Sequence, residues 1–207
     1  MKNFFIKYKH CWTLLYVFIY MPWFVFLEGH VKHYTIIHCS LDDKIPFCEY
    51  FVIPYFLWFL FVALTMTYLL FYSVDEFYKA SAFLFIGMTV FLIISTVFPN
   101  GLNLRTDISG RDNICARIVS NLYKTDTSTN VFPSVHVFNT LGCMIALFKS
   151  KGLKGHNIIK TFIFILSVSI ILSTVFLKQH SVIDVIGGFV LAIIMYVLVY
   201  VIKWRKK

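Results

Sequence analysis

Long apolar stretches separated by short polar segments make up most of the sequence. Six of these stretches are largely uncharged: Cys11–Leu27, Tyr50–Tyr72, Ala80–Phe98, Val131–Phe148, Ile159–Leu177 and Val182–Ile202. An α-helix rises about 1.5 Å per residue, so each stretch can cross a hydrocarbon core of about 30 Å. The pattern predicts an all-α polytopic membrane protein, in which six transmembrane helices form a single domain over residues 1–207.

The composition supports a membrane protein and excludes other classes. Apolar residues make up 59% of the chain and charged residues only 14%, with 23 Phe among 207 residues. Such a chain is too hydrophobic to be disordered and has too little polar surface for an ordinary soluble fold. Five cysteines are too few for a disulfide-built scaffold. Cys39 and Cys48 share one predicted loop, and the sequence leaves open whether they pair or stay free.

The charged residues are distributed unequally between the two sides of the predicted membrane. Six spans place both termini on one side, which then holds 12 basic and 2 acidic residues, a net charge of +10. This side includes Lys2, Lys7, Lys203, Arg205, Lys206 and Lys207, next to the interfacial Trp204. The other side holds 7 basic and 8 acidic residues, a net charge of −1. By the positive-inside rule both termini are expected in the cytoplasm. The overall charge of +9 therefore indicates topology and gives no support for nucleic-acid binding.

Two of the predicted outer loops are long, Glu28–Glu49 and Pro99–Asn130. In the second, Ile114, Ile118 and Leu122 follow a helical spacing. This segment is either a short helix lying at the outer interface or an ordinary ordered loop.

Polar residues gather where the last four predicted spans reach the outer face. The set comprises Arg105, Ser134, His136, Lys178, His180 and Asp184. Polar groups near membrane depth are costly, so a shared function is the default hypothesis. Taken singly, each has a structural explanation, because a basic residue at a span end is often an anchor and a His/Asp pair can be a structural hydrogen bond or a metal site.

This set of residue types suits a phosphate ligand. Pro133 and Ser134 lie at the start of the predicted fourth span, where the free backbone N–H groups near Val135 would form an anion site. Arg105 can bind phosphoryl oxygens with two N–H groups, and Lys178 adds a point charge. His180 and Asp184 are four residues apart, so the carboxylate can orient the imidazole for nucleophilic attack. His136, on another helix, can supply a proton to a leaving group.

These residues resemble the motifs of the type 2 phosphatidic acid phosphatase superfamily, which includes lipid phosphatases, bacterial acid phosphatases and vanadium haloperoxidases. Pro133-Ser134-Val135-His136 resembles its Pro-Ser-Gly-His motif, and His180 to Asp184 reproduce its His-x3-Asp ending. Arg105 resembles the Arg of its first motif. The resemblance covers roughly Pro99 to Gly188.

The chain also departs from the family pattern at several positions. Phe98 and Thr106 replace the Lys and Pro of the first motif, Val135 replaces a Gly, and Thr174 replaces the Arg of the third motif. Lys178 is a candidate substitute for that missing cation. The looser pattern is similar to the branch that contains inositol phosphorylceramide and sphingomyelin synthases.

The resemblance implies a metal-independent membrane enzyme that uses no cofactor. We expect a lipid phosphatase acting at the extracytoplasmic face of the cell membrane on a phosphatidate-like or polyprenyl-pyrophosphate-like substrate. His180 would form a phosphohistidine, His136 would act as the acid and base, and Asp184 would orient His180. Arg105, Ser134, Val135 and Lys178 would bind the phosphate. The alternatives are a phosphotransferase that moves a phospho-head group between lipids, and a transporter or membrane assembly protein.

Overall fold

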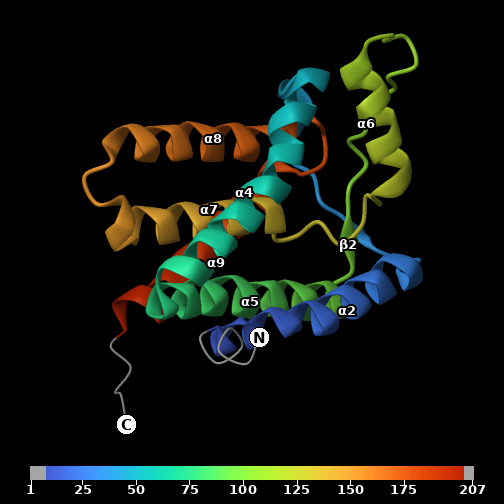
Figure 1. Ribbon diagram of the computed structural model, residues 1–207. Helices are drawn as coiled ribbons and strands as arrows, with labels where there is room; N and C mark the ends of the chain where they lie inside the picture. The colour runs from blue at the N-terminus through green and yellow to red at the C-terminus, as the bar shows by residue number, and fades with distance from the viewer. Residues whose placement is uncertain (1–7, 203–207) are drawn as a thin grey trace.

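The computed structural model describes residues 8–202, most of which are helical (Figure 1). In chain order the elements are η1 (Lys9–Tyr16), α2 (Val17–His30), β1 (Thr35–Ile36), α3 (Ser40–Lys44), η2 (Glu49–Phe51), α4 (Val52–Tyr72), α5 (Val74–Val97), β2 (Asn100–Gly101), α6 (Ile114–Thr125), α7 (Val135–Lys149), η3 (Lys151–Leu153), α8 (Asn157–Phe176), α9 (Val182–Tyr196) and η4 (Val197–Val201). The strands β1 and β2 have two residues each and pair in parallel. The predicted helical architecture is therefore confirmed.

Five helical segments of the described chain are long and apolar enough to cross a membrane. They are Lys9–His30, Glu49–Tyr72, Val74–Val97, Asn157–Phe176 and Val182–Val201, and each coincides with a predicted span. The remaining predicted span, Val131–Phe148, contains α7. That helix has only 15 residues, because the first four residues of the predicted span are not helical. It is about 22 Å long at about 1.5 Å per residue.

Helix α7 lies at the centre of the bundle and packs against α4, α5, α8 and α9. Nine of its 15 residues are buried. Gly87 on α5 lies against the ring of Phe138, and Gly142 on α7 lies against the ring of Phe83, so a Cβ atom at either glycine would overlap the facing ring. The close approach of α5 and α7 therefore depends on both glycines. This packing fixes the position of the start of α7, which carries His136.

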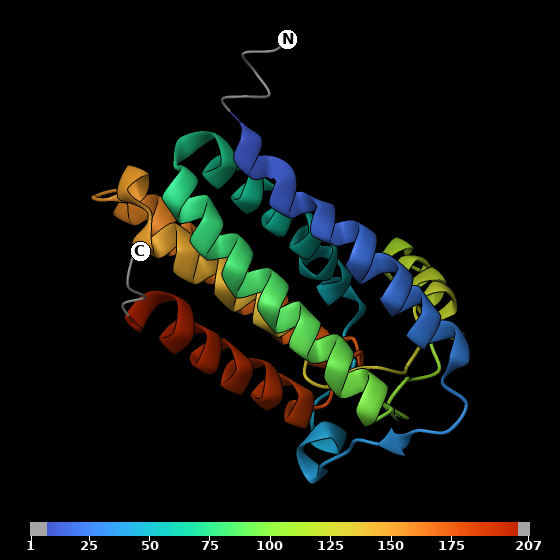
Figure 2. The same cartoon turned by 90° about the horizontal axis from the view of Figure 1, so that it is seen from below.

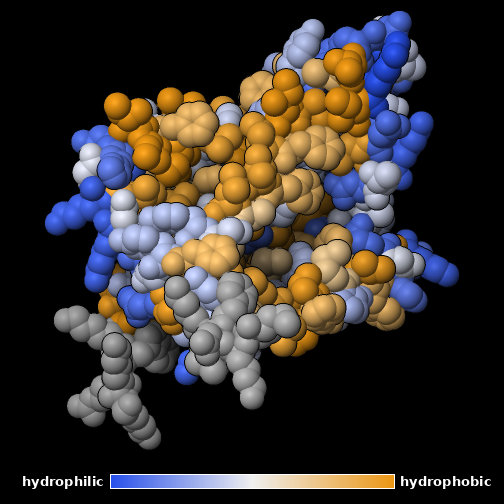
Figure 3. Space-filling model, viewed as in Figure 1, coloured by the Kyte–Doolittle hydropathy of each residue, from blue (hydrophilic) through white to orange (hydrophobic). Residues whose placement is uncertain are grey.

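Large apolar side chains cover the outside of the bundle. Phe18 on α2, Phe59 on α4, Phe162 on α8 and Ile193 on α9 are all exposed. In the space-filling view, hydrophobic side chains cover much of the visible face and hydrophilic ones gather at its edges (Figure 3). A surface of this kind would aggregate in water, whereas a lipid environment accommodates it. The arrangement is that of a multi-pass membrane protein.

The connecting segments separate into two ends of the bundle (Figure 2). The described chain begins and ends at one end, while β1, β2 and α6 lie at the other. The basic residues Lys2, Lys7, Lys203, Arg205, Lys206 and Lys207, and Trp204, lie outside the described residues. The helix predicted as one of two possibilities in the second long loop is present as α6. It buries Cys115, Val119 and Leu122 against Val52 and Tyr55, whereas Ile114 is exposed. All five cysteines are free thiols.

Candidate active site

The start of α7 lies at the wall of a cavity. Ser134 is the N-cap of α7, and its hydroxyl accepts a hydrogen bond from the N–H of Val137. The Ser134 N–H in turn donates to the carbonyl of Asp184, which ties α7 to α9 at 3.0 Å. The first N–H groups of an α-helix have no partner within the helix. Those of Val135 and His136 belong to residues that line the cavity, and an anion site at this position stays a prediction. Ser134 is fully buried and acts as the helix cap.

His136 is held by aromatic rings of α4. Its imidazole stacks on Tyr55, with ring centroids 4.7 Å apart, and contacts Trp58, with centroids 4.3 Å apart. The Nε2 atom of His136 is buried without a hydrogen-bond partner. The two rings therefore fix the plane of the imidazole and leave one nitrogen available to a ligand.

His180 lies in the turn between α8 and α9, whose backbone is held firmly. The N–H groups of Gln179 and His180 both donate to the carbonyl of Thr174, at 2.9 and 3.0 Å. The rings of His136 and His180 are 5.6 Å apart, centroid to centroid. The structure thus brings together two histidines that are 44 positions apart in the sequence, as predicted from the span ends.

Asp184 lies directly behind His180. Its Oδ2 atom is 3.5 Å from Nδ1 of His180 and accepts a 2.8 Å hydrogen bond from the N–H of Ser181, as the capping box of α9. At 3.5 Å the contact with His180 is longer than a hydrogen bond, so it acts chiefly through charge. The predicted His180 and Asp184 pair is therefore present in space, with Nε2 of His180 on the side away from the carboxylate.

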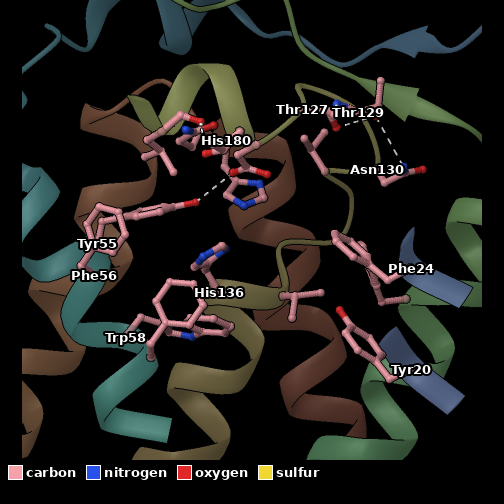
Figure 4. A pocket seen from close by; sticks show the side chains of 18 of the residues that line it. Tyr20, Phe24, Tyr55, Phe56, Trp58, Thr127, Thr129, Asn130, His136 and His180 are labelled. Atoms are coloured by element: carbon pink, nitrogen blue, oxygen red, sulfur yellow. Dashed lines mark hydrogen bonds between the residues drawn. The ribbon is translucent and has the colours of Figure 1, made fainter. Parts of the chain in front are cut away.

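Both histidines line one cavity of about 450 Å³ (Figure 4). Seven of the residues that line it are aromatic: Tyr20, Phe24, Tyr55, Phe56, Trp58, Phe59 and Phe91. Its polar lining comes from Thr125, Asp126, Thr127, Thr129, Asn130 and Gln179 besides the histidines. An apolar chamber with a few converging polar groups is typical of a ligand site. Its residues come from α2, α4 and α5 as well as from the predicted motif region.

Arg105 lies beside this cavity and does not line it. Its guanidinium donates to the carbonyls of Tyr123 and Asp126, each at 2.7 Å, and stacks over the Tyr123 ring. A third contact, at 3.4 Å, reaches Oε1 of Gln179. Arg105 therefore fixes the end of α6 against the turn that carries His180.

Lys178 points away from the cavity. Its ammonium group donates to the carbonyls of Asp42 and Ile45, at 2.6 and 2.5 Å. The residue is buried and has a positive φ of 55°. The ammonium group of Lys178 thus binds the loop that contains α3, and the structure does not bring it together with the two histidines.

Asp42 is a residue that the sequence analysis did not single out for the site. It is buried, and its carboxylate accepts hydrogen bonds from the Ser181 hydroxyl at 2.7 Å and from the N–H groups of Val182 and Cys39 at 2.8 Å. Burial raises the pKa of this carboxyl, but the hydrogen bonds outweigh burial and lower the pKa below its ordinary value. Asp42 and Asp184 therefore both cap the start of α9.

Asp126 is the second residue that the sequence analysis did not assign. Its carboxylate lines the cavity and accepts a 3.4 Å hydrogen bond from the Tyr55 hydroxyl. Burial raises the pKa of Asp126, and the nearby Glu28 carboxylate raises it further, while His180 and Arg105 oppose the shift. Glu28 accepts hydrogen bonds from Thr127 and Asn130. No spacing rule links Asp126 to the histidines, because only the folded loop brings it over His180.

The described residues, 8–202, contain no group of three or more His, Cys, Asp or Glu side chains arranged to hold a metal ion.

Comparison with known proteins identifies one family. The PAP2 superfamily model matches residues 111–207. No curated protein and no solved structure matches the chain significantly. The matched segment contains both histidines, Asp184 and the start of α7, whereas Arg105, Asp42 and the aromatic residues of α2 and α4 precede it. The resemblance seen in the sequence is therefore confirmed: residues 111–207 carry the features of the PAP2 superfamily.

Proposed function

We propose that the protein is an integral-membrane lipid phosphatase that hydrolyses a phosphomonoester or pyrophosphate of a lipid through a phosphohistidine. One observation carries the proposal: His136 and His180, from different helices, face one aromatic-lined cavity, with Asp184 behind His180. Residues 111–207 match the PAP2 superfamily, and the bundle is apolar. Both observations fit a membrane lipid phosphatase or a related phosphotransferase.

In the first step, the lone pair on Nε2 of His180 attacks the phosphorus. The bond between phosphorus and the lipid oxygen breaks, and protonated His136 gives its proton to that oxygen. Asp184 stabilises the positive charge that develops on the His180 ring. In the second step, water attacks phosphorus while His136 takes its proton. The N–P bond then breaks, inorganic phosphate leaves, and both histidines return to their starting states.

The lining of the cavity supports a lipid substrate. Seven aromatic side chains surround the two histidines, so an acyl or isoprenoid chain next to the phosphate would contact apolar surface. The same lining also limits access of water to the phosphohistidine. This observation favours one second candidate, a phosphotransferase in which a lipid hydroxyl replaces water in the second step.

The proposed topology has six membrane spans, with α7 as the shortest, both termini in the cytoplasm and the site at the extracytoplasmic face of the cell membrane. Four neighbouring helices surround α7, so its polar flanking residues contact protein rather than lipid. The net charges of +10 and −1 on the two sides support this orientation. Reporter fusions to the C-terminus and to the loop after β2 would test it, because the proposal requires them on opposite sides.

A direct test is phosphate release by the purified protein in EDTA, with phosphatidate and a polyprenyl pyrophosphate as separate substrates. Release of inorganic phosphate is expected without any acceptor. Label that is transferred from a ³²P-lipid to the protein, lost in acid and retained in alkali would identify a phosphohistidine. A strict requirement for a divalent cation would overturn the proposed mechanism. Formation of a new phospholipid without release of phosphate would favour the phosphotransferase.

A further inference from the structure

Gln179 is a buried amide in the wall of the cavity. It is the only glutamine in the chain, it is 5% exposed, and it lines the same cavity as His136 and His180. Its backbone N–H is bound to the carbonyl of Thr174, and the preceding residue, Lys178, is anchored on two further carbonyls. The side chain therefore extends from a fixed backbone immediately before the proposed nucleophile.

Arg105 determines which way the amide of Gln179 faces. The Nη2 atom of Arg105 is 3.4 Å from Oε1 of Gln179. A guanidinium group can only donate hydrogen bonds, so the atom facing it must be the amide oxygen. The amide nitrogen then faces the other way, and Nε2 of Gln179 is buried without a partner. A buried, unpaired N–H donor is unfavourable unless a ligand supplies an acceptor.

The other groups expected to hold phosphate oxygens are mostly occupied elsewhere. The Arg105 guanidinium binds the carbonyls of Tyr123 and Asp126, and the Lys178 ammonium binds those of Asp42 and Ile45. The Ser134 hydroxyl caps α7. Among the predicted phosphate ligands, this leaves the backbone at Val135, beside His136, in contact with the cavity. Three buried side-chain N–H donors in this part of the described chain have no partner, namely Nε1 of Trp58, Nε of Arg105 and Nε2 of Gln179. Of these, Gln179 both lines the cavity and directly precedes His180 in the sequence, whereas Trp58 lies beside His136 and Arg105 does not line the cavity.

From this geometry we infer that the amide of Gln179 donates a hydrogen bond to a non-bridging oxygen of the phosphoryl group during its transfer to His180. Arg105 is a positioning residue, which holds the amide oxygen and polarises the N–H bonds through its positive charge. The inference rests on the proposed phosphoryl transfer. The sequence predicted that the side chains of Arg105, Lys178 and Ser134 stabilise the negative charge on the phosphoryl oxygens. The inference gives this role to the neutral amide of Gln179 and to the start of α7.

Two substitutions test the donor. Gln179→Glu keeps the shape and the contact with Arg105 but replaces the NH2 group with an acceptor oxygen, while Gln179→Met removes hydrogen bonding at similar length. We expect kcat to fall about 100-fold in Gln179→Met and further in Gln179→Glu, as for loss of one oxyanion donor. The inhibition constant of inorganic phosphate should rise in parallel. Asn121→Asp, on the exposed face of α6, adds the same charge and should leave both constants unchanged.

A measurement on the unmodified chain does not depend on whether the variants fold. Because Gln179 is the only glutamine, ¹⁵N-glutamine labelling gives a single side-chain amide signal in an NMR spectrum. Inorganic phosphate should shift that signal in step with its binding measured by ³¹P titration. Binding of phosphate with an unmoved amide signal, or turnover by both Gln179 variants at the wild-type rate, would overturn this inference alone. Absence of both turnover and phosphate binding would overturn the proposed function, and the inference with it.

Discussion

The two sides of the turn that carries His180 differ in how their polar atoms are paired. On the side of α3, the buried Asp42 accepts three hydrogen bonds and the buried Lys178 ammonium donates two. On the side of the cavity, Nε2 of His136 and Nε2 of Gln179 have no partner. The paired side holds the turn in place, and the unpaired side is prepared to bind. The comparison teaches that burial alone does not mark a functional polar group, whereas an unmet hydrogen bond facing a cavity does.

The largest expected effect comes from removing the nucleophile on the cavity side. His180→Ala should lower turnover of a lipid phosphate by about 10⁴-fold or more, because it removes the imidazole that forms the covalent intermediate in the proposed mechanism. The thermal midpoint should change little. His38→Ala, at an exposed histidine paired with Asp43, is the matched control. Turnover by the His180 variant at the control's rate would rule out a phosphohistidine at this position.

His136→Ala should be slow rather than inactive. Loss of the proton donor slows cleavage of the bond between phosphorus and the lipid oxygen by about 10²–10⁴-fold, the usual contribution of general acid catalysis. The second step loses its base as well, so phosphohistidine should accumulate on His180 when a substrate with a good leaving group is supplied. Quenched-flow labelling with such a substrate measures the accumulation. An unlabelled protein with normal turnover would contradict the role of His136.

On the paired side, Asp42→Asn should reduce stability more than chemistry. It loses charge-assisted hydrogen bonds to the start of α9, at a cost of about 2 kcal/mol in the free energy of unfolding. Asp43→Asn is the control, since the neighbouring carboxylate is exposed. The pKa of Asp42 is lowered in the folded protein, so its contribution is present at neutral pH and is lost as the pH falls through the folded pKa. Between neutral and acidic pH, the free energy of unfolding should therefore depend less on pH in Asp42→Asn than in the wild type. Asp43→Asn should follow the wild type.

The smallest expected effect concerns the carboxylate of Asp126 on the cavity side. Its pKa is raised by burial and by Glu28, so it takes up a proton at a higher pH than an ordinary Asp. Above that pKa the negative charge of Asp126 repels phosphate and weakens its binding. Below that pKa the carboxyl is neutral and the repulsion is absent. Asp126→Asn should therefore lower the inhibition constant of phosphate about 3- to 10-fold at neutral pH, a change consistent with one nearby charge.

The pH profile separates this charge effect from a change in shape. The difference between Asp126→Asn and the wild type should vanish at acidic pH, where the wild-type carboxyl is protonated. Asp112→Asn, at an exposed ion pair with Arg117, should follow the wild type throughout. A constant difference at every pH would show that Asp126 acts by packing rather than by charge.

The helices and the pairing of His180 with Asp184 could be predicted from the sequence because their patterns are local. Apolar stretches locate the helices to within a few residues, and the four-residue spacing places Asp184 in the first turn of α9 with His180 in the turn just before it. His136 could be assigned to the site as well, because it lies at the same outer face of the predicted spans as His180. The start of α7 was predicted too early, since hydropathy does not distinguish an extended apolar segment from a helical one.

The directions of long side chains could not be predicted in this way. Arg105 and Lys178 reach several ångströms from their backbone, and each turns towards carbonyls supplied by a distant segment. Asp42 and Asp126 were missed for the same reason, because their partners are far away in the sequence. Gln179 carried no signal beyond its place next to His180. These positions depend on tertiary contacts, for which a single sequence contains no repeating pattern.

The hydrogen bond between Asp42 and the N–H of Val182 joins residues 140 positions apart. Protein synthesis runs from the N-terminus, so two of the three hydrogen bonds of the Asp42 carboxylate cannot form until Ser181 and Val182 have been made. A chain that ended before α8 would contain the aromatic residues of α2 and α4 but neither His180 nor Asp184. A fragment of residues 111–207 would contain both of these residues without Asp42 and without those aromatic residues. The proposed activity would therefore require both parts of the chain together.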